Sequence, residues 1–299
     1  MIDLAIITVA YKSLGDLPSL LGSIPQAVGT LTWHLVVVDN YSLDGLEERF
    51  GATPQVSVFN SGENLGYSGG LNAGLAHAPA SRFTVFLNAD LTLKPDSLVL
   101  LVDALKTENT AVSVPLLVDE DGRIQPSLRR EPATLRALGE AVFGDHWPRR
   151  PSWLSEMVRN PDEYHGTKPV EWATGAALMI KSDVLSEVGP WDSERFFLYS
   201  EETDYFRRVR QQGFGITFVP DAVVGHRGGG SGTSLELNAL MAVNKVRYFR
   251  KWHGAGASSV FFAATVLHSL LRIRRPESSI TLRALFSSAA RAALPGGGS

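Results

Sequence analysis

Runs of consecutive apolar residues recur along the first 118 residues, and stretches with helical spacing separate them. The apolar runs predict buried strands at residues 3–9, 33–38, 55–59, 82–87 and 111–118. The stretches between and after them predict helices at residues 16–24, 43–50, 68–77 and 95–106. Buried strands that alternate with short helices are typical of a mostly parallel sheet with helices on both faces, so we expect an α/β fold.

The pattern changes after residue 118. Residues 119–170 contain six prolines and read as irregular, and a connection of this length is usually functional, so a lid is one interpretation. Later patterns predict a strand at 177–180, a short helix from Ser182 to about Gly189, a helix from residue 201 to Gln212 and a strand pair from residue 216. Helices at 238–252 and 258–273 follow, and the last residues read as a flexible tail.

The composition, 44% hydrophobic and 20% charged, is that of a folded protein, and 299 residues are enough for one large α/β domain or for one domain with a helical appendage. There is no cysteine, which excludes disulfides and thiolate metal sites. No run of 18 or more residues lacks polar groups, and the N-terminus reads at once as a strand. We therefore expect neither a spanning helix nor a signal peptide, and a cytoplasmic location.

Charge is distributed unevenly along the chain. From Glu236 onward, nine lysines and arginines face two glutamates, a net charge of +7, which leaves −10 for the first 235 residues because the whole chain carries −3. This asymmetry indicates that the C-terminal helices face an anionic surface or ligand, for example through peripheral contact with headgroups at the inner face of the membrane. A solvated helical face, or packing on the sheet domain, is the alternative.

The apolar run at 83–87 stops abruptly at Asn88-Ala89-Asp90. In an open α/β sheet, ligands bind at the carboxyl ends of the strands, which is where this short acidic turn lies. Oxygen ligands suit Mg²⁺ or Mn²⁺, which usually complete their coordination with substrate phosphate oxygens. The turn therefore predicts a metal site, unless Asn88 and Asp90 are only turn formers.

The first strand-to-helix turn argues against the dinucleotide dehydrogenases. It reads VAYKSLGD and lacks the G-x-G-x-x-G fingerprint, which disfavours a dinucleotide dehydrogenase, and the chain has no phosphate loop of the GKS type. Asp39 ends the second strand, where a carboxylate can accept hydrogen bonds from a ribose or a base, or simply cap a turn. The glycine-rich stretch at 62–75 allows close approach to a ligand or to a neighbouring helix.

A second informative block spans residues 171–214. Small residues at 174–177 leave room for a substrate ring, and Glu201, Glu202 and Asp204 follow in the first turn of a helix. Three carboxylates exceed what a helix N-terminus needs, and clustered carboxylates tend to hold one raised pKa, as a general base requires.

Three basic residues are further candidates for a site. His226 precedes a glycine-rich run, so it is either a third metal ligand or a structural or exposed histidine, and the glycines predict a mobile loop that closes over a ligand. Arg129 and Arg130 lie near a turn, where they contact either phosphate or solvent.

Together these residues resemble the family 2 glycosyltransferases of GT-A fold, and within them the bacterial rhamnosyltransferase-like group. The resemblance covers residues 3–252. The matching stretches, in order, are ITVAYKS, VVVDNYSLDG, NLGYSGGLNAGL, FLNADLTL, WATGAALMIKSDVLSEVGPWDSERFFLYSEETDYFRR and GHRGGGS. Each is weak alone, and the ordered set is specific.

The resemblance implies a role for each matching residue. Asp90 is implied as the metal ligand of a D-x-D motif in which Asn88 replaces the first acid, with His226 completing the site. Glu202 is implied as the base, in a role that Glu201 or Asp204 could share. The other implied contacts are to the donor nucleotide (Thr8, Ala10, Tyr11, Asp39, Asn64, Gly66, Asn88, Ala89), to the diphosphate (Arg227, Ser231) and to the acceptor or sugar (Trp172, Thr174, Gly175, Ala176).

The resemblance also implies a reaction and a domain division. The expected enzyme is an inverting transferase that uses Mg²⁺ or Mn²⁺ and moves L-rhamnose from dTDP-L-rhamnose to a glycan or polyprenyl-linked acceptor. Residues 1–235 form the catalytic domain, divided into a nucleotide-binding half (1–118) and an acceptor-side half (119–235), and 236–299 form the basic helical extension. The alternatives are a UDP- or GDP-sugar transferase and a non-catalytic carbohydrate-binding protein, and the sequence is compatible with an oligomer.

Overall fold

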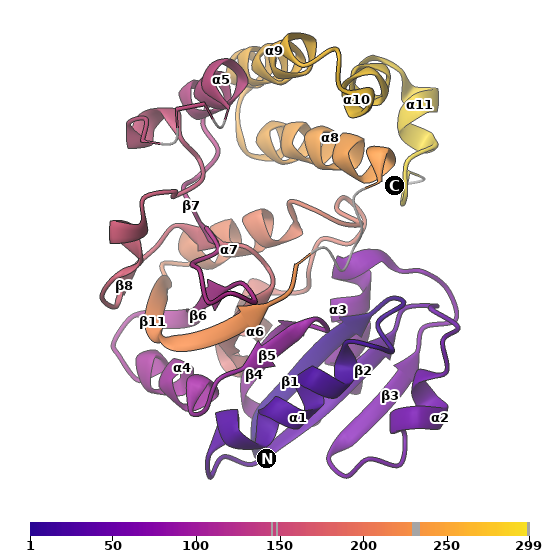
Figure 1. Cartoon of the computed structure of the whole chain (residues 1–299), viewed down its shortest axis with the longest axis vertical. Helices are drawn as coiled ribbons and strands as arrows, with labels where there is room; N and C mark the ends of the chain where they lie inside the picture. The colour runs from indigo at the N-terminus through magenta and orange to yellow at the C-terminus, as the bar shows by residue number, and fades with distance from the viewer. Residues whose placement is uncertain (145, 148, 229–233, 298–299) are drawn as a thin grey trace.

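The computed structural model describes residues 1–144, 146–147, 149–228 and 234–297. It consists of a sheet covered by helices and of a separate layer of C-terminal helices that lies across one end of the sheet (Figure 1). The predicted α/β architecture is confirmed.

The first strands form a parallel sheet because their apolar runs are buried on both faces. β1 lies between β2 and β4, so that Ile6 pairs with Leu35 on one side and with Val85 on the other. The strands of this part are β1 (Ile2–Ala10), β2 (Trp33–Asp39), β3 (Val56–Asn60) and β4 (Ser81–Asn88).

The second half of the sheet follows the order β4-β10-β6-β11-β5. β10 runs antiparallel between β4 and β6, and β11 is parallel to β6. The strands of this part are β5 (Leu91–Leu93), β6 (Thr110–Val118), β10 (Ala177–Lys181) and β11 (Gly215–His226). The strand pair predicted from residue 216 is instead one strand, β11, with an irregularity between Val219 and Val223.

Four helices accompany the first strands: α1 (Leu17–Val28), α2 (Leu46–Phe50), α3 (Gly66–His77) and α4 (Ser97–Leu105). α3 packs directly on β1 because glycines face the strand. A Cβ at Gly70 would lie 2.7 Å from Cγ1 of Val9, so only glycine permits this approach. The close packing brings the N-terminus of α3 to the carboxyl ends of the strands, where the candidate site lies.

Residues 119–170 are not irregular throughout, which corrects the prediction. They contain α5 (Thr134–Phe143), which packs on α9 (Ala255–Leu271), and several short elements. The prolines lie before and after α5 and none lies inside it. The helical spacing of its apolar residues is therefore uninterrupted, but it extends over only 10 residues. The short elements are β7 (Leu128–Arg129), β8 (Lys168–Pro169), β9 (Trp172–Ala173), η1 (Ser152–Leu154) and η2 (Pro161–Tyr164).

The remaining helices are α6 (Ser182–Val188), α7 (Glu201–Gln211), α8 (Leu235–Trp252), α10 (Pro276–Phe286) and α11 (Ser288–Ala292). α8 and α9 match the two predicted C-terminal helices, whereas α10 and α11 were not predicted. The C-terminal helices α8 to α11 and α5 together form a layer (Figure 1). This layer has its own core, which includes Leu240, Phe249, Phe261 and Leu285. Within the described residues, no helix combines the length and hydrophobicity needed to cross a membrane.

The tail was predicted to be flexible, but its described part packs against the rest of the chain. Leu294 is buried in the core of the helical layer, and Gly297 N–H donates to the Leu294 carbonyl oxygen at 2.8 Å. Pro295 reaches the candidate site described next.

Candidate active site

A cavity of about 520 Å³ opens at the carboxyl end of β1 and β4. The N-terminus of α3, the β4–β5 turn, the segment before α7 and the end of β11 enclose it. Its lining comes from the first 90 residues (Val9, Tyr11, Ser13, Asp16, Asn40, Asn64, Gly66, Tyr67, Asn88, Ala89, Asp90) and from the second half of the chain (Phe197, Leu198, Tyr199, His226, Ser234, Leu237, Pro295). We refer to it as the donor-side cavity.

An amide network shapes one wall of the donor-side cavity. Asn40 donates from Nδ2 to Asn64 Oδ1 at 3.0 Å and to the Gly66 carbonyl oxygen at 3.1 Å, and its Oδ1 accepts from Leu65 N–H at 2.9 Å. The network ties the end of β2 to the start of α3. Asn64 and Gly66 therefore lie where the sequence placed them, and Asn40 is a site residue that the sequence reasoning did not assign.

Three other predicted nucleotide contacts do not line this cavity. Thr8 and Ala10 are fully buried in β1, and Thr8 Oγ1 donates to the Leu87 carbonyl oxygen. Successive side chains of a strand alternate between faces, so Val9 lines the cavity and its two neighbours face the other way. Asp39 Oδ1 accepts from Ser42 N–H at 2.8 Å, which matches the turn-capping alternative; its contact with a base stays a prediction.

Asp90 and His226 meet at the floor of the donor-side cavity. β5 pairs antiparallel with β11, which sets His226 opposite Leu91 and brings its Nε2 to 3.5 Å from Asp90 Oδ2. Burial alone would raise the pKa of Asp90, but His226 and Arg227 together hold that pKa below its usual range. An ionised carboxylate beside an imidazole is a donor pair for Mg²⁺ or Mn²⁺.

Gln125 fixes the orientation of the His226 ring. Its Nε2 donates to the His226 carbonyl oxygen at 2.7 Å, which leaves its Oε1 at 2.9 Å from His226 Nδ1. In this arrangement Nδ1 donates to Oε1, and Nε2 faces the carboxylate of Asp90. Such an outer hydrogen bond is the usual support of a metal-binding histidine. The described residues contain no third histidine or carboxylate in the cluster, so further ligands have to come from a substrate or water.

The two predicted diphosphate residues have different outcomes. Arg227 forms an ion pair with Asp16, and it lines a neighbouring cavity together with Asp90 and His226. Its guanidinium thus lies close to the metal-type pair. Ser231, together with residues 229–233 of the predicted mobile loop, lies outside the described residues.

A second cavity of about 480 Å³ adjoins the first, and we refer to it as the acceptor-side cavity. The four residues predicted for the sugar or acceptor pocket, Trp172, Thr174, Gly175 and Ala176, line it, and so do Glu201 and Glu202. The two cavities share a wall made of Tyr67, Asn88, Leu198, Tyr199 and His226. Tyr67, whose hydroxyl donates to the Gly175 carbonyl oxygen at 3.0 Å, is a second site residue that the sequence reasoning missed.

Glu201 and Glu202 open helix α7, and both are held at the bottom of the acceptor-side cavity. The two preceding residues, Tyr199 and Ser200, have left-handed φ values of 69° and 68°, a conformation that non-glycine residues rarely adopt. Such strain is typical of active sites, and here it turns the chain sharply so that both carboxylates point inward.

The proton affinities of the two glutamates are raised unequally. Burial, and then the neighbouring Glu202, raise the pKa of Glu201 well above its usual value. Burial also raises the pKa of Glu202, but Arg129, Lys245 and backbone donors lower it again in part. Within the described residues, neither Oε2 atom has a hydrogen-bond partner. Glu201 is therefore the better proton holder, and Glu202 the better carboxylate.

Asp204, the third candidate acid, points away from both cavities. It is fully buried, and its carboxylate lies 3.0 Å from Arg208 Nε and 2.7 Å from Lys251 Nζ. Trp252 Nε1 also donates to it at 2.8 Å. These contacts join α7 to α8, which corrects the prediction of a catalytic Asp204: the residue supports the fold.

The comparisons with known proteins agree with this geometry. The model of the family described as Glycosyl transferase family 2 matches residues 5–168. The N-acetylglucosaminyl-diphospho-decaprenol L-rhamnosyltransferase of Mycobacterium tuberculosis is 31% identical over 235 residues, which cover 75% of both chains. A low-salt glycan biosynthesis hexosyltransferase of Haloferax volcanii is 28% identical over 218 residues, covering 72% of this chain and 64% of the relative.

Solved structures show the same fold at low sequence identity. GalNAc-T7 with UDP, GalNAc and Mn²⁺ is similar with a TM-score of 0.62 at 17% identity, over 95% of this chain and 54% of that one. A mannosyltransferase from Pyrobaculum calidifontis with GDP-Man and Mn²⁺ has a TM-score of 0.56 at 16% identity, over 100% and 80%. The predicted GT-A fold is therefore confirmed.

Proposed function

Because this chain belongs to glycosyl transferase family 2, and is therefore a glycosyltransferase, we propose that it moves L-rhamnose from dTDP-L-rhamnose to a hydroxyl of a glycan or lipid-linked glycan, with inversion. The observation that carries this proposal is the pair of joined cavities. Asp90 lines one of them, Glu201 and Glu202 line the other, and His226 belongs to the wall that the two cavities share.

In the proposed reaction, Glu202 is the base. It takes the proton of the acceptor hydroxyl, whose oxygen forms a bond to the anomeric carbon while the bond from that carbon to the diphosphate oxygen breaks. The nucleoside diphosphate leaves from the opposite face, which inverts the centre. Glu201 keeps its own proton and so does not add a second negative charge beside the base. One positioned base contributes about 10²–10⁴ in rate.

Asp90 and His226 fit a divalent cation, since the carboxylate of Asp90 is held ionised and the imidazole Nε2 of His226 faces it. When bound there, Mg²⁺ or Mn²⁺ would supply charge neutralisation for the departing diphosphate. Asn88 contributes an amide rather than a second carboxylate to the same cavity. The protein supplies few ligands, so we propose that metal and donor bind together rather than metal alone.

The donor is tested by a panel of nucleotide sugars. We expect Mn²⁺-dependent hydrolysis of dTDP-L-rhamnose in the absence of acceptor, and slower hydrolysis of UDP- and GDP-sugars at equal concentration. Preference for a UDP- or GDP-sugar would overturn the assignment of the donor, but the proposed transferase activity would stand. Binding of nucleotide sugars without hydrolysis or transfer of any of them would favour the non-catalytic alternative, which the amide at Asn88 supports.

We also propose a peripheral membrane contact, at the end of the helical layer where α5 meets α9 (Figure 1). Arg272 Nη1 donates to the Ala141 carbonyl oxygen at 2.9 Å, which sets the exposed side chains of Leu271 and Ile273 beside exposed Val142. The adjacent arginines, 274 and 275, are also exposed. Apolar side chains flanked by cations suit an anionic bilayer surface.

Sedimentation with lipid vesicles tests this contact. We expect the protein to bind phosphatidylglycerol vesicles more tightly than phosphatidylcholine vesicles, and Leu271→Asp to weaken that binding. Leu43→Asp, at an exposed position in the nucleotide-binding half, is the matched control. Equal recovery with the two kinds of vesicle would count against the proposal.

A further inference from the structure

The acceptor-side cavity does not end at the catalytic pocket. A third cavity of about 510 Å³ lies among α5, α8, α9 and α10, and we refer to it as the helical cavity. Five residues line both: Arg129, Glu156, Met157, Met241 and Lys245. The space in front of Glu202 therefore continues, past two cations, into the helical layer.

Arg129 is the first of these cations, and the structure separates it from its neighbour in sequence. Arg130 is occupied, because its Nη2 contacts both carboxylate oxygens of Glu163 at 2.8 and 2.9 Å. Arg129 donates from Nη1 to the carbonyl oxygens of Pro126 and Leu128, at 2.7 and 3.2 Å. Among the described residues no carboxylate forms an ion pair with it. Its Nε and Nη2 are thus available for the two-point contact that guanidinium makes with phosphate.

Lys245 is the second cation, on α8. Its Nζ lies 3.2 Å from Oε1 of Glu156, the one carboxylate among the shared lining residues. The ammonium has three donors and its side chain is 41% exposed, so Lys245 can keep Glu156 and still bind a second anion. Arg129 and Lys245 both lower the pKa of Glu202, which shows that the two positive charges lie within electrostatic reach of the base.

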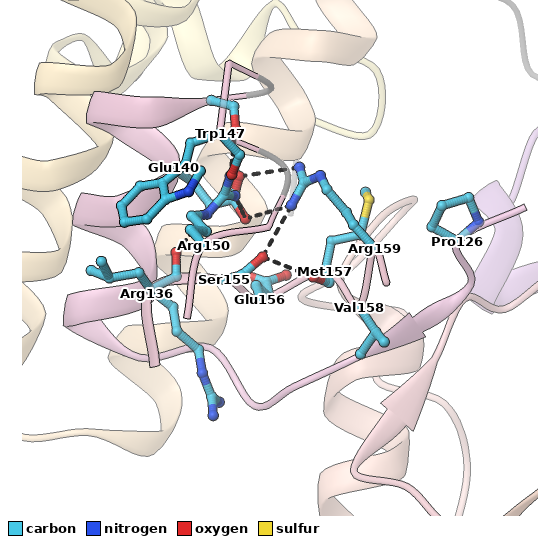
Figure 2. Close-up of polar contacts among 12 residues, drawn as sticks. Pro126, Arg136, Glu140, Trp147, Arg150, Ser155, Glu156, Met157, Val158 and Arg159 are labelled. Carbon is cyan, nitrogen blue, oxygen red and sulfur yellow. Dashed lines mark hydrogen bonds and ion pairs between the residues drawn. The ribbon is translucent and has the colours of Figure 1, made fainter. Parts of the chain in front are cut away.

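The other charged groups around the helical cavity are largely paired. Figure 2 shows the guanidinium of Arg159 directed at Glu140 and Ser155, with Nη1 distances of 3.2 and 3.1 Å. Arg150 also pairs with Glu140, and Arg272 donates to carbonyl oxygens at the end of α5. Burial and nearby cations lower the pKa of His268 and favour its neutral form. Arg275 and Glu277 also line the cavity, so the net charge of its lining is positive.

Apolar side chains also contribute to the helical cavity. They come from α5, from the segment between η1 and η2, and from α8 and α9. They are Ala137, Met157, Met241, Ala242, Phe261 and Ala264. Methionines adapt to irregular apolar ligands, so a hydrocarbon chain can lie along this side of the cavity.

Arg129 and Lys245 thus line both the cavity that holds the base and the helical cavity, which also has an apolar side. We propose that Arg129 and Lys245 bind the diphosphate of a polyprenyl-diphosphate-linked acceptor, and that the first part of its prenyl chain occupies the helical cavity. The acceptor sugar then lies at Glu202. This inference rests on the proposed transferase function and specifies its acceptor. The acceptor in the name of the mycobacterial relative also carries a diphosphate and a prenyl chain.

The test measures binding of farnesyl diphosphate by equilibrium dialysis while saturating dTDP and Mg²⁺ fill the donor-side cavity. We expect binding to the unmodified protein, and binding weaker by about 10–100-fold in Arg129→Gln and in Lys245→Gln, because each removes a charged contact to phosphate. Arg250→Gln is the matched control, since Arg250 is exposed on the same helix and lines neither cavity. Inorganic pyrophosphate and farnesol, which each carry half of the probe, should both bind more weakly.

The outcomes separate this inference from the proposed function. If dTDP binds and farnesyl diphosphate does not, the acceptor subsite is wrong and the donor assignment stands. If Arg129→Gln and Lys245→Gln both bind farnesyl diphosphate as tightly as Arg250→Gln does, Arg129 and Lys245 do not bind the diphosphate. If dTDP itself fails to bind, the proposed donor is wrong. Lys245→Gln keeps the test open should Arg129→Gln fold poorly, because Lys245 is partly exposed.

Discussion

The donor side and the acceptor side of the site use the same chemical group in opposite states. On the donor side, His226 and Arg227 keep the pKa of Asp90 low, although the residue is buried. On the acceptor side, burial raises the pKa values of Glu201 and Glu202, and repulsion from Glu202 raises that of Glu201 further. A carboxylate that stays ionised suits a cation, whereas one that readily accepts a proton suits a base. The neighbours of each acid, and not its residue type, decide which task it can perform.

The largest expected effect comes from removing the base. We expect Glu202→Gln to lower kcat by about 10²–10⁴, because the amide cannot take the acceptor proton. Binding of dTDP should not change, because Glu202 does not line the donor-side cavity. Steady-state transfer assays and dTDP calorimetry measure the two effects. Near-full transfer by this variant would show that the base is a different residue.

A substitution of Asp204 tests whether this acid stabilises the fold, whereas Glu201 and Glu202 serve the reaction. We expect Asp204→Asn to lower the free energy of unfolding by about 3 kcal/mol, since it removes the carboxylate that pairs with Arg208 and leaves Lys251 with Asp192 alone. Urea unfolding measures this loss, and kcat of the folded fraction should stay close to that of the unmodified protein. A fall in kcat comparable to that of Glu202→Gln, with unchanged stability, would return Asp204 to the catalytic group.

Gln125 tests the donor side indirectly, because its side chain hydrogen-bonds to His226 while it lines only the acceptor-side cavity. We expect Gln125→Leu to weaken Mn²⁺ activation by about 10–100-fold, because His226 loses the hydrogen bond that directs its Nε2 at Asp90. A titration of Mn²⁺ against donor hydrolysis gives the apparent affinity. Saturating metal should restore most of the rate, which a loss of catalytic groups would not allow.

The smallest effect is a pH dependence of stability from Glu201. The folded pKa of Glu201 lies above the unfolded value of about 4.3, so its favourable contribution is complete below that pH and is lost as the pH rises through the folded pKa. Glu201→Gln carries no charge at any pH. We therefore expect the variant to gain stability over the unmodified protein between pH 4 and pH 8, about a few degrees in Tm. A Tm difference that does not change with pH would show that Glu201 has an ordinary pKa.

Much of the donor side could be predicted from the sequence because its elements carry strong local signals. The apolar runs of β1, β2 and β4 are continuous, and the turn at Asn88–Asp90 follows one of them directly. The acceptor side was harder to predict. α5 is short and flanked by prolines, and β10 enters the sheet between β4 and β6 from a distant part of the chain. Arg129 and Arg130 could not be distinguished until Glu163 was placed.

The sequence alone determined the alternation of strands and helices, the family resemblance and the acidic residues at the ends of β4 and at the start of α7. These features depend on the spacing of apolar residues and on residues that are close in sequence, so the sequence alone is enough to predict them. Only the tertiary structure decided that Gln125 orients His226, that Asp204 turns toward α8, and that Arg129 and Lys245 stand beside the base. Packing between distant elements sets the burial and the nearby charges of each group, and these determine its protonation and its chemistry.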